Sequence, residues 1–110
     1  MKLLIAGSRN LTDINLEKYI PNDVELIISG GAKGIDTLAE NYADKKGISK
    51  LIMRPKYELY GKGAPLKRNE EMIKIADQVL VFWDGKSRGT RFTIDKAKKQ
   101  NKPVNVVIFE

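Results

Sequence analysis

The sequence predicts an α/β fold, a Rossmann-like and doubly wound sheet of five mostly parallel strands with helices on both faces. Strand-like and helix-like segments alternate along the chain in the order βαβαβαβαβ. The strand-like segments are mostly continuous apolar runs, which is typical of parallel strands buried on both faces. Right-handed crossovers between such strands then wind the sheet doubly. With 110 residues, the chain has room for one domain, residues 1–110.

The helix after the second strand has the clearest periodicity in the first half of the chain. Its apolar residues fall at the spacing of one helix face from Ile35 to Ala43, and Gly47 fits the residue that ends a helix. The elements predicted here are a strand over Lys2–Ala6, a short helix over Leu11–Ile20 that starts near Asp13 or Asn15 and ends before Pro21, a strand over Val24–Ser29, a helix over Gly34–Lys46 and a strand over Lys50–Arg54.

The second half contains two strands and two helices after a long loop. Pro55–Pro65 has two prolines, two glycines and no periodicity, which predicts a loop of a length that is often functional. The remaining elements are a helix over Leu66–Ala76, a strand over Gln78–Trp83, a turn over Asp84–Gly89, a helix over Thr90–Asn101 and a strand over Val104–Phe109.

The chain is organised around Leu26–Asp36, where a buried strand enters a glycine-rich turn and then a helix. Such a turn favours an anion, because the first helical N–H groups lack partners, the helix dipole is positive there, and glycines let the backbone approach a ligand. Ser29 can add a hydroxyl and Lys33 a charge. The alternative is a turn that only connects two elements, but that needs one or two glycines, and this turn has three.

Similar residues follow other strands of the predicted sheet. Gly7–Arg9, Ser29–Gly34 and Asp84–Thr90 are rich in glycine, serine and basic residues. Because ligands of such sheets bind outside the carboxyl ends of the strands, these turns predict a cradle for phosphate and ribose, with Asp36 and Asp84 as acceptors for sugar hydroxyls. The motifs of Walker NTPases and of dinucleotide dehydrogenases are absent from the turns.

Two polar residues begin the helix after the long loop, near the same edge. Asn69 points inward, so its amide must find a partner in a neighbouring loop or in a ligand. Arg68 suits an anion, and the alternative is a surface salt bridge to Glu70 or Glu71, which would stabilise little. Nearby aromatic side chains either pack at the rim of the core or stack on a base; they are Trp83, Tyr57 and Tyr60.

The composition excludes several classes of site. The sequence has neither cysteine nor histidine, which excludes disulfides, a structural zinc site and a histidine-based triad. A magnesium site on carboxylates stays chemically open, but no metal is predicted. The net charge of +6 favours anionic partners, and the basic last quarter is either a phosphate-facing surface or a solvated helix face. Without a long apolar run or a signal-peptide core, a cytoplasmic protein with no membrane partner is expected.

Five motifs together resemble the SLOG superfamily, the Rossmann-like group that includes the Smf/DprA DNA-processing proteins, the YpsA-like proteins and the Lonely-guy phosphoribohydrolases. They are Gly7-Ser8-Arg9, SGGAKGID over Ser29–Asp36, Arg68-Asn69 with Met72, the strand from Ala76 to Phe82, and D-G-x-S-x-G-T over Asp84–Thr90. The small stand-alone branch related to YspA and YpsA is the nearest match. The resemblance runs from Lys2 to Ala97.

The resemblance implies a nucleotide-binding module, and it leaves an enzyme as an alternative. Lonely-guy enzymes split the N-glycosidic bond of nucleoside monophosphates with R-K-x-x-M and P-G-G-x-G-T-x-x-E motifs. Arg68 and Met72 match the first motif, but Thr93 stands where the second has its glutamate. Cleavage of an N-glycoside normally uses a carboxylate, so a binding module is favoured. The candidates to replace the glutamate are Glu70, Glu71 and Asp84.

These arguments predict binding of a nucleotide or nucleotide-derived small molecule, as in a sensor, with no other cofactor. One alternative is binding of single-stranded DNA, as in the DprA-like branch, whose members generally carry further domains. The other is a nucleotide hydrolase with Arg68 as the candidate catalytic residue. Family relatives often dimerise, so a homodimer is compatible with the resemblance. The predicted ligand- and phosphate-binding residues are Gly7, Ser8, Arg9, Ser29, Gly30, Gly31, Lys33, Gly34, Asp36, Arg68, Asn69, Asp84, Ser87, Gly89 and Thr90.

Overall fold

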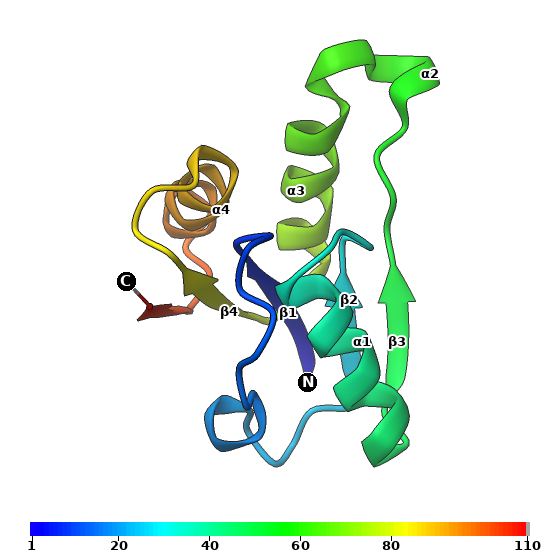
Figure 1. The fold of residues 1–110 in the computed structure, drawn as a ribbon. Coiled ribbons are helices and arrows are strands. Elements are labelled where there is room, and N and C mark those ends of the chain that lie inside the picture. Colours follow the sequence, from blue (N-terminus) through cyan, green and yellow to red (C-terminus); the bar gives the residue numbers. More distant parts are fainter. Residues whose placement is uncertain (110) are drawn as a thin grey trace.

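The strands of the computed structural model, which describes residues 1–109, form one all-parallel sheet (Figure 1). They lie in the order β3-β2-β1-β4-β5. Their bounds are β1 Lys2–Gly7, β2 Leu26–Ser29, β3 Ser49–Ile52, β4 Gln78–Trp83 and β5 Val104–Ile108. The predicted α/β class and the parallel five-stranded sheet are therefore confirmed.

The central strand β1 is buried on both sides because its two faces are both apolar. Leu3 and Ile5 belong to the core cluster on one face, and Leu4 belongs to the cluster on the other. Leu4 pairs in parallel register with Ile28 of β2 and with Val79 of β4. The chain first winds outward from β1 to β3 and then continues on the other side with β4 and β5. The strand order thus reverses between β1 and β4, where ligands of such sheets bind.

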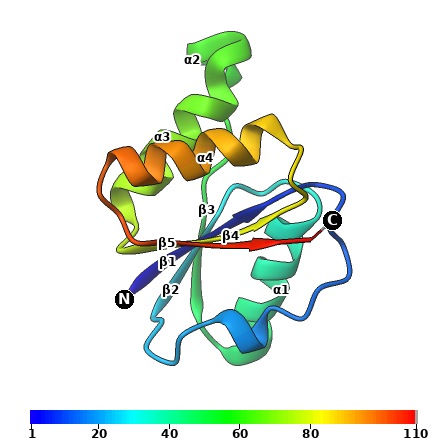
Figure 2. The ribbon, with the colours of Figure 1, turned by 90° about the vertical axis from the view of Figure 1, so that its left-hand side faces the viewer.

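Helices cover both faces of this sheet, as predicted (Figure 2). Helix α1 (Ile35–Lys46) and the 3₁₀ turn η1 (Glu17–Tyr19) pack on one face, and α3 (Ala64–Ile75) and α4 (Arg88–Lys99) pack on the other. The three long helices have 12 residues each. Within residues 1–109 no helix is both long and apolar enough to span a bilayer.

The helix predicted over Leu11–Ile20 is wrong, because only η1 is helical in that segment. The side chain of Asn15 accepts a hydrogen bond from the N–H of Glu17 at 3.1 Å. Such a local bond offers the backbone an alternative to a helix. Leu16 and Ile20 are nevertheless buried in the core. The apolar residues of this segment are therefore apolar because they pack in the core, although the backbone there is irregular and not helical.

The loop predicted over Pro55–Pro65 is also largely wrong. It contains the short helix α2 (Tyr57–Tyr60) and the 3₁₀ turn η2 (Gly61–Gly63), and α3 already begins at Ala64. Pro65 lies in the first turn of α3, where proline is favoured because its missing N–H would have no partner there. The segment α2–η2 projects beyond the carboxyl end of β3 (Figure 1).

Candidate functional site

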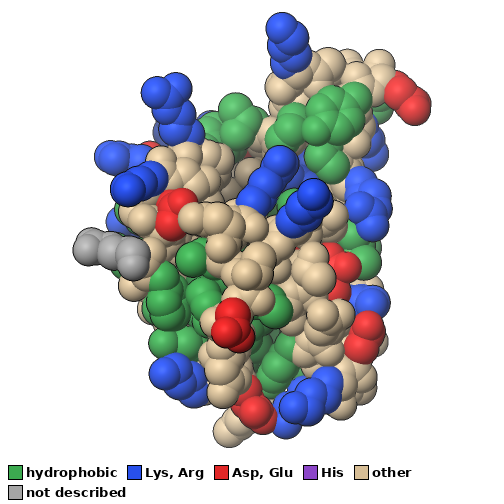
Figure 3. All heavy atoms as spheres, in the orientation of Figure 1, with side chains coloured by type: hydrophobic (Ala, Val, Ile, Leu, Met, Phe, Trp, Pro, Cys, Tyr) green, Lys and Arg blue, Asp and Glu red, His purple; other side chains and the backbone are tan. Residues whose placement is uncertain are grey.

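A cleft of about 470 Å³ opens at the carboxyl ends of β1 and β4, where the strand order reverses. Its walls come from the turn after β1, the loop between β2 and α1, the start of α3 and the N-terminus of α4. A cleft of this volume suits a small-molecule ligand. Lys and Arg side chains are spread over the upper part of the face drawn in Figure 3.

The cleft brings together most of the residues that the sequence predicts for ligand binding. Those that line it are Gly7, Ser8, Arg9, Asp36, Arg68, Asn69, Asp84, Ser87, Gly89 and Thr90. The others, which do not belong to the lining formed by the described residues, are Ser29, Gly30, Gly31, Lys33 and Gly34. Seven further residues line the cleft that the sequence does not predict as ligand contacts. Met72 and Thr93 occupy motif positions, whereas only adjacency to the motifs indicates the others, which are Ala6, Asn10, Ala32, Pro65 and Leu66.

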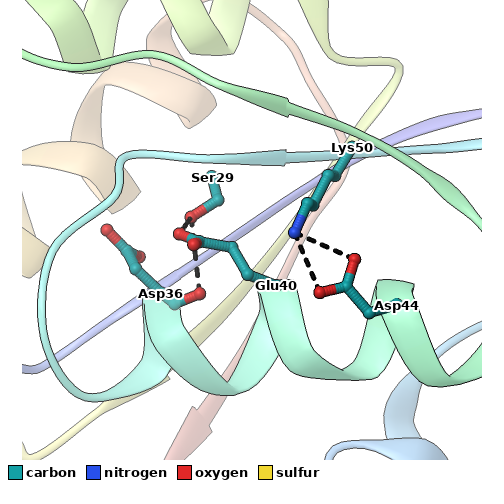
Figure 4. A network of polar contacts seen from close by, with 5 residues as sticks. All are labelled: Ser29, Asp36, Glu40, Asp44 and Lys50. Atoms are coloured by element: carbon teal, nitrogen blue, oxygen red, sulfur yellow. Dashed lines mark hydrogen bonds and ion pairs between the residues drawn. The ribbon is translucent and has the colours of Figure 1, made fainter.

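The glycine-rich loop after β2 folds back on the protein and builds a wall of the cleft. Ser29 is fully buried, and its hydroxyl donates to the carboxylate of Glu40 at 2.8 Å (Figure 4). The same oxygen accepts the N–H of Gly31 at 3.2 Å. Gly34 has φ +77°, and a Cβ there would lie 2.5 Å from the carbonyl oxygen of Arg9. This glycine lets the loop pack directly against the turn after β1.

Arg68 holds three parts of the site together through its guanidinium group. Its Nη1 donates to the carbonyl of Gly30 at 2.6 Å and to that of Met53 at 3.2 Å, while Nε donates to Asn69 Oδ1 at 2.8 Å. The salt bridge to Glu70 or Glu71 considered from the sequence does not form, and Glu70 pairs with Lys96 at 3.6 Å. Burial lowers the pKa of the Arg68 guanidinium, and the negative charge of nearby Asp36 opposes this shift. The group stays protonated.

The side chain of Asn69 finds its partners within the protein. Its Nδ2 donates to Thr93 Oγ1 at 3.1 Å, and this hydroxyl lies 3.2 Å from the carbonyl of Gly89, to which it donates. Thr93 is 2% exposed and lines the cleft. The position at which the Lonely-guy motif has its glutamate therefore carries a hydroxyl that links α3 to the first turn of α4.

The turn between β4 and α4 is held by hydrogen bonds that leave the helix N-terminus open to the cleft. Asp84 Oδ1 accepts the N–H groups of Ser87 at 2.8 Å and Lys86 at 2.9 Å, which lower the pKa of the Asp84 carboxyl. Ser87 caps α4 by accepting from Thr90. A Cβ at Gly89 would meet nothing within 4 Å. Unpaired N–H groups and this open space suit an anion.

Arg9 is the exposed cation of the cleft. It follows β1 and lines the same cleft as Gly89 and Thr90 in the first turn of α4. Among residues 1–109, no hydrogen bond or ion pair engages its guanidinium. Its five N–H donors are thus free to bind a phosphate or a carboxylate, which a guanidinium can do in a bidentate way.

Asp36 supplies a carboxyl group that the protein keeps partly out of water. It is 8% exposed, and its Oδ2 accepts the N–H of Ala32 at 3.1 Å. Burial raises the pKa of the Asp36 carboxyl, and the charge of Glu40 adds to this, while the bond from Ala32 and the charges of Arg68 and Arg9 act against it. A buried carboxyl with a raised pKa in a cleft is a candidate for proton transfer or for hydrogen bonding to a ligand hydroxyl.

Replacing Asp36 by asparagine is expected to stabilise the fold at neutral pH. Because the pKa is raised in the folded protein, the carboxyl favours folding below its ordinary value of 3.8, and this advantage is lost as the pH rises through the folded pKa. Asparagine keeps an oxygen for the N–H of Ala32 and removes the charge. Urea unfolding of both proteins at several pH values measures the difference. A less stable Asp36→Asn variant at neutral pH would show instead that the ionised carboxylate stabilises the protein.

Comparison with known proteins identifies the family of the chain. It is 34% identical to the Gene 61 protein of Mycobacterium phage D29 over 85 residues, which cover 72% of this chain and 68% of the phage protein. The chain belongs to the family of that Gene 61 protein. No protein-family model matches the sequence, and no solved structure matches it.

The acidic side chains of residues 1–109 form no cluster of three or more metal ligands. The carboxylates that line the cleft are Asp36 and Asp84, and both already accept backbone N–H groups. The cleft instead combines cations, a helix N-terminus and hydroxyl groups, which are donors for an anionic organic ligand.

Proposed function

We propose that the protein is a SLOG-type module that binds a nucleotide or a nucleotide-derived small molecule in the cleft between β1 and β4. One observation carries the proposal: the unpaired guanidinium of Arg9 and the open N-terminus of α4 at Gly89 line the same cleft at the reversal of strand order. Together they offer a charged fork and backbone N–H groups to one phosphate. Asp36 and Asp84 add acceptors for sugar hydroxyls.

The proposal is tested by thermal unfolding with AMP, ADP, ATP, cyclic nucleotides, ADP-ribose, NAD and a short single-stranded oligonucleotide. A ligand at one hundred times its dissociation constant stabilises the folded state by about 2.7 kcal/mol, which is a shift of several degrees for a domain of this size. A shift by one small nucleotide supports the proposal. Failure of every compound to shift the unfolding temperature would contradict it. A shift by the oligonucleotide alone that disappears in salt would indicate nucleic-acid binding.

Replacing Arg9 by alanine is expected to weaken the binding of a phosphate-bearing ligand without destabilising the fold. Loss of a charge-assisted contact lowers affinity by about 10- to 150-fold, and removal of an exposed, unpaired side chain changes stability by less than about 0.5 kcal/mol. Isothermal titration of both proteins measures the change. The matched control is Arg91→Ala, which removes the same charge from the exposed side of α4. Equal losses of affinity in the two variants would show that Arg9 contributes only to the overall positive charge of the protein and makes no specific contact with the ligand.

Asp36 favours a second candidate function, the hydrolysis of an N-glycosidic bond. Its carboxyl has a raised pKa and lines the cleft, whereas Glu70 pairs with Lys96 and Asp84 holds its own turn. A carboxyl near ribose can stabilise positive charge or direct a water molecule. Release of free base from a nucleoside monophosphate, lost in Asp36→Asn, would support this function. Intact ligand after prolonged incubation would leave a binding module.

A further inference from the structure

A second cavity, which we call the α2 groove, adjoins the cleft on the side of β3. It has a volume of about 280 Å³ and lies between the carboxyl end of β3, helix α2 and the first turns of α3. Its apolar lining residues are Ile52, Met53 and Ala64, and Tyr60 lines the same space. Apolar surface beside an aromatic ring suits a flat heterocycle.

The cleft and the α2 groove meet at Arg68, which lines both. On α3, Ala64, Arg68 and Glu71 line the groove, whereas Pro65, Asn69 and Met72 line the cleft. These sets are neighbouring stripes of one helix, because residues three or four apart lie on the same face. The protein uses Nε and Nη1 of Arg68 for its three hydrogen bonds. No hydrogen bond within residues 1–109 engages Nη2, so its two N–H groups are available to a ligand.

The charges of the α2 groove match an anionic ligand. Arg54, Lys56 and Arg68 line it, and Glu71 is the opposing charge among its lining residues. Lys67 adds a further cation beside it, with Nζ 5.9 Å from the centre of the Tyr60 ring. A hollow on the opposite side of the cleft, bordered by Asn10 and Asp84, has one lysine and one aspartate and so no excess of positive charge. The path of positive charge therefore leads from the cleft toward α2.

We propose that the cleft and the α2 groove form one binding path for a ligand of two nucleotide units joined through phosphate. One unit occupies the cleft, the linking phosphate binds Nη2 of Arg68, and the base of the second unit stacks on Tyr60. The inference rests on the proposed nucleotide binding in the cleft, and it adds a second subsite and a minimum length of ligand. Aromatic stacking together with a cationic path for the backbone is how proteins bind short single strands and dinucleotides without reading sequence.

The test compares mononucleotides with matching dinucleotides by isothermal titration of the full chain. The pairs are AMP with pApA and UMP with pUpU. Each base stacked on an aromatic side chain contributes about 5- to 150-fold in affinity, so at least one dinucleotide is expected to bind about tenfold or more tightly than its mononucleotide. Tyr60→Leu should abolish this advantage and leave mononucleotide affinity unchanged, whereas Tyr60→Phe should keep the advantage because it keeps the ring.

Leu59→Ala is the control, because Leu59 belongs to the same helical turn, is 69% exposed and does not line the groove. Tyr60 is itself 41% exposed, and a thermal unfolding curve for each variant verifies that it folds. Dinucleotides that bind no more tightly than mononucleotides, or an advantage that persists in Tyr60→Leu, would overturn the inference while leaving nucleotide binding in the cleft intact. Absence of binding by every nucleotide would overturn both proposals.

An octamer pA8 distinguishes the two sources of such a ligand. Binding as tight as that of pApA indicates the end of a nucleic-acid strand, since the path must then be open at the far side of Tyr60. Rejection of the octamer indicates a free dinucleotide. The site of two units is itself decided by the tighter binding of a dinucleotide than of its mononucleotide, and the octamer decides only between these two sources of the ligand.

Discussion

Replacing Gly34 by alanine is expected to lower the free energy of unfolding by about 3 kcal/mol or more. Gly34 precedes α1 with φ +77° and ψ −124°, a backbone conformation that side chains with a Cβ strongly disfavour. The added carbon would also lie 2.5 Å from the carbonyl oxygen of Arg9 and 2.7 Å from that of Ser8. These are backbone atoms of the turn after β1, so relief requires that the two walls of the cleft move apart.

Chemical denaturation of the wild type and of two glycine variants measures this effect. The matched control is Gly63→Ala, since Gly63 has φ −82° and a Cβ there would meet nothing within 4 Å. This control should leave stability unchanged or raise it by about 0.4–1 kcal/mol, because alanine restricts the unfolded chain. If Gly34→Ala were as stable as Gly63→Ala, the close contact between the two loops would not exist in solution.

Much of the fold could be predicted because short-range patterns coincide with long-range packing. The run Gln78–Trp83 is both strand-like and flanked by aspartates, and β4 has these same bounds. Gly47 ends α1 in the left-handed conformation, and its N–H bonds to the carbonyls of Ala43 and Asp44. The apolar residues of β4 also form its buried faces, and Gly47 follows directly on the helix whose Ile35, Ala39 and Ala43 are buried, so local preference and tertiary structure agree.

Two segments were predicted wrongly, and in each the sequence pattern is a poor guide to the backbone. From Leu11 to Ile20 the apolar residues fit a helix, but the Asn15 side chain holds an irregular backbone. Tyr57–Tyr60 is too short for helical periodicity to be recognised. The structure places it beyond β3 and directly before η2 and α3, whose first residue, Ala64, is buried.

The cleft could be located from the sequence, but the division of labour among its residues could not. Placing Gly7–Arg9 and Asp84–Thr90 at one edge requires only the rule for parallel sheets, and both turns do line the cleft. By contrast, the partners of Arg68 are backbone carbonyls of Gly30 and Met53, far away in the sequence. Every residue type has a backbone carbonyl, so the sequence does not show which carbonyls accept hydrogen bonds. Whether a motif arginine such as Arg68 binds a ligand or holds the protein together therefore cannot be predicted from the sequence alone.

Replacing Arg68 by methionine is expected to lower the free energy of unfolding by about 2–4 kcal/mol. Methionine keeps much of the aliphatic volume but removes three hydrogen bonds made by a charged donor. It also leaves the carboxylate of Asp36 without the Arg68 charge that opposes its raised pKa. The loss should be measured by urea unfolding, with Arg54→Met as the control. Arg54 is exposed and makes one hydrogen bond, to Gly31 at 3.2 Å, so its removal should cost about 1 kcal/mol or less.

The pH dependence of the Arg68→Met variant separates its two effects. Without the cation, burial raises the folded pKa of Asp36 further. The carboxyl is protonated in both states below its ordinary value of 3.8, so only the lost hydrogen bonds act there, and the charge effect appears as the pH rises toward neutrality. The destabilisation should therefore be smaller near pH 4 than at pH 7 and independent of pH when Asp36→Asn is present as well. A destabilisation equal at both pH values would show that Arg68 acts through its hydrogen bonds alone. Because Arg68→Met also destabilises the fold, a loss of ligand binding in this variant must be interpreted together with its measured free energy of unfolding.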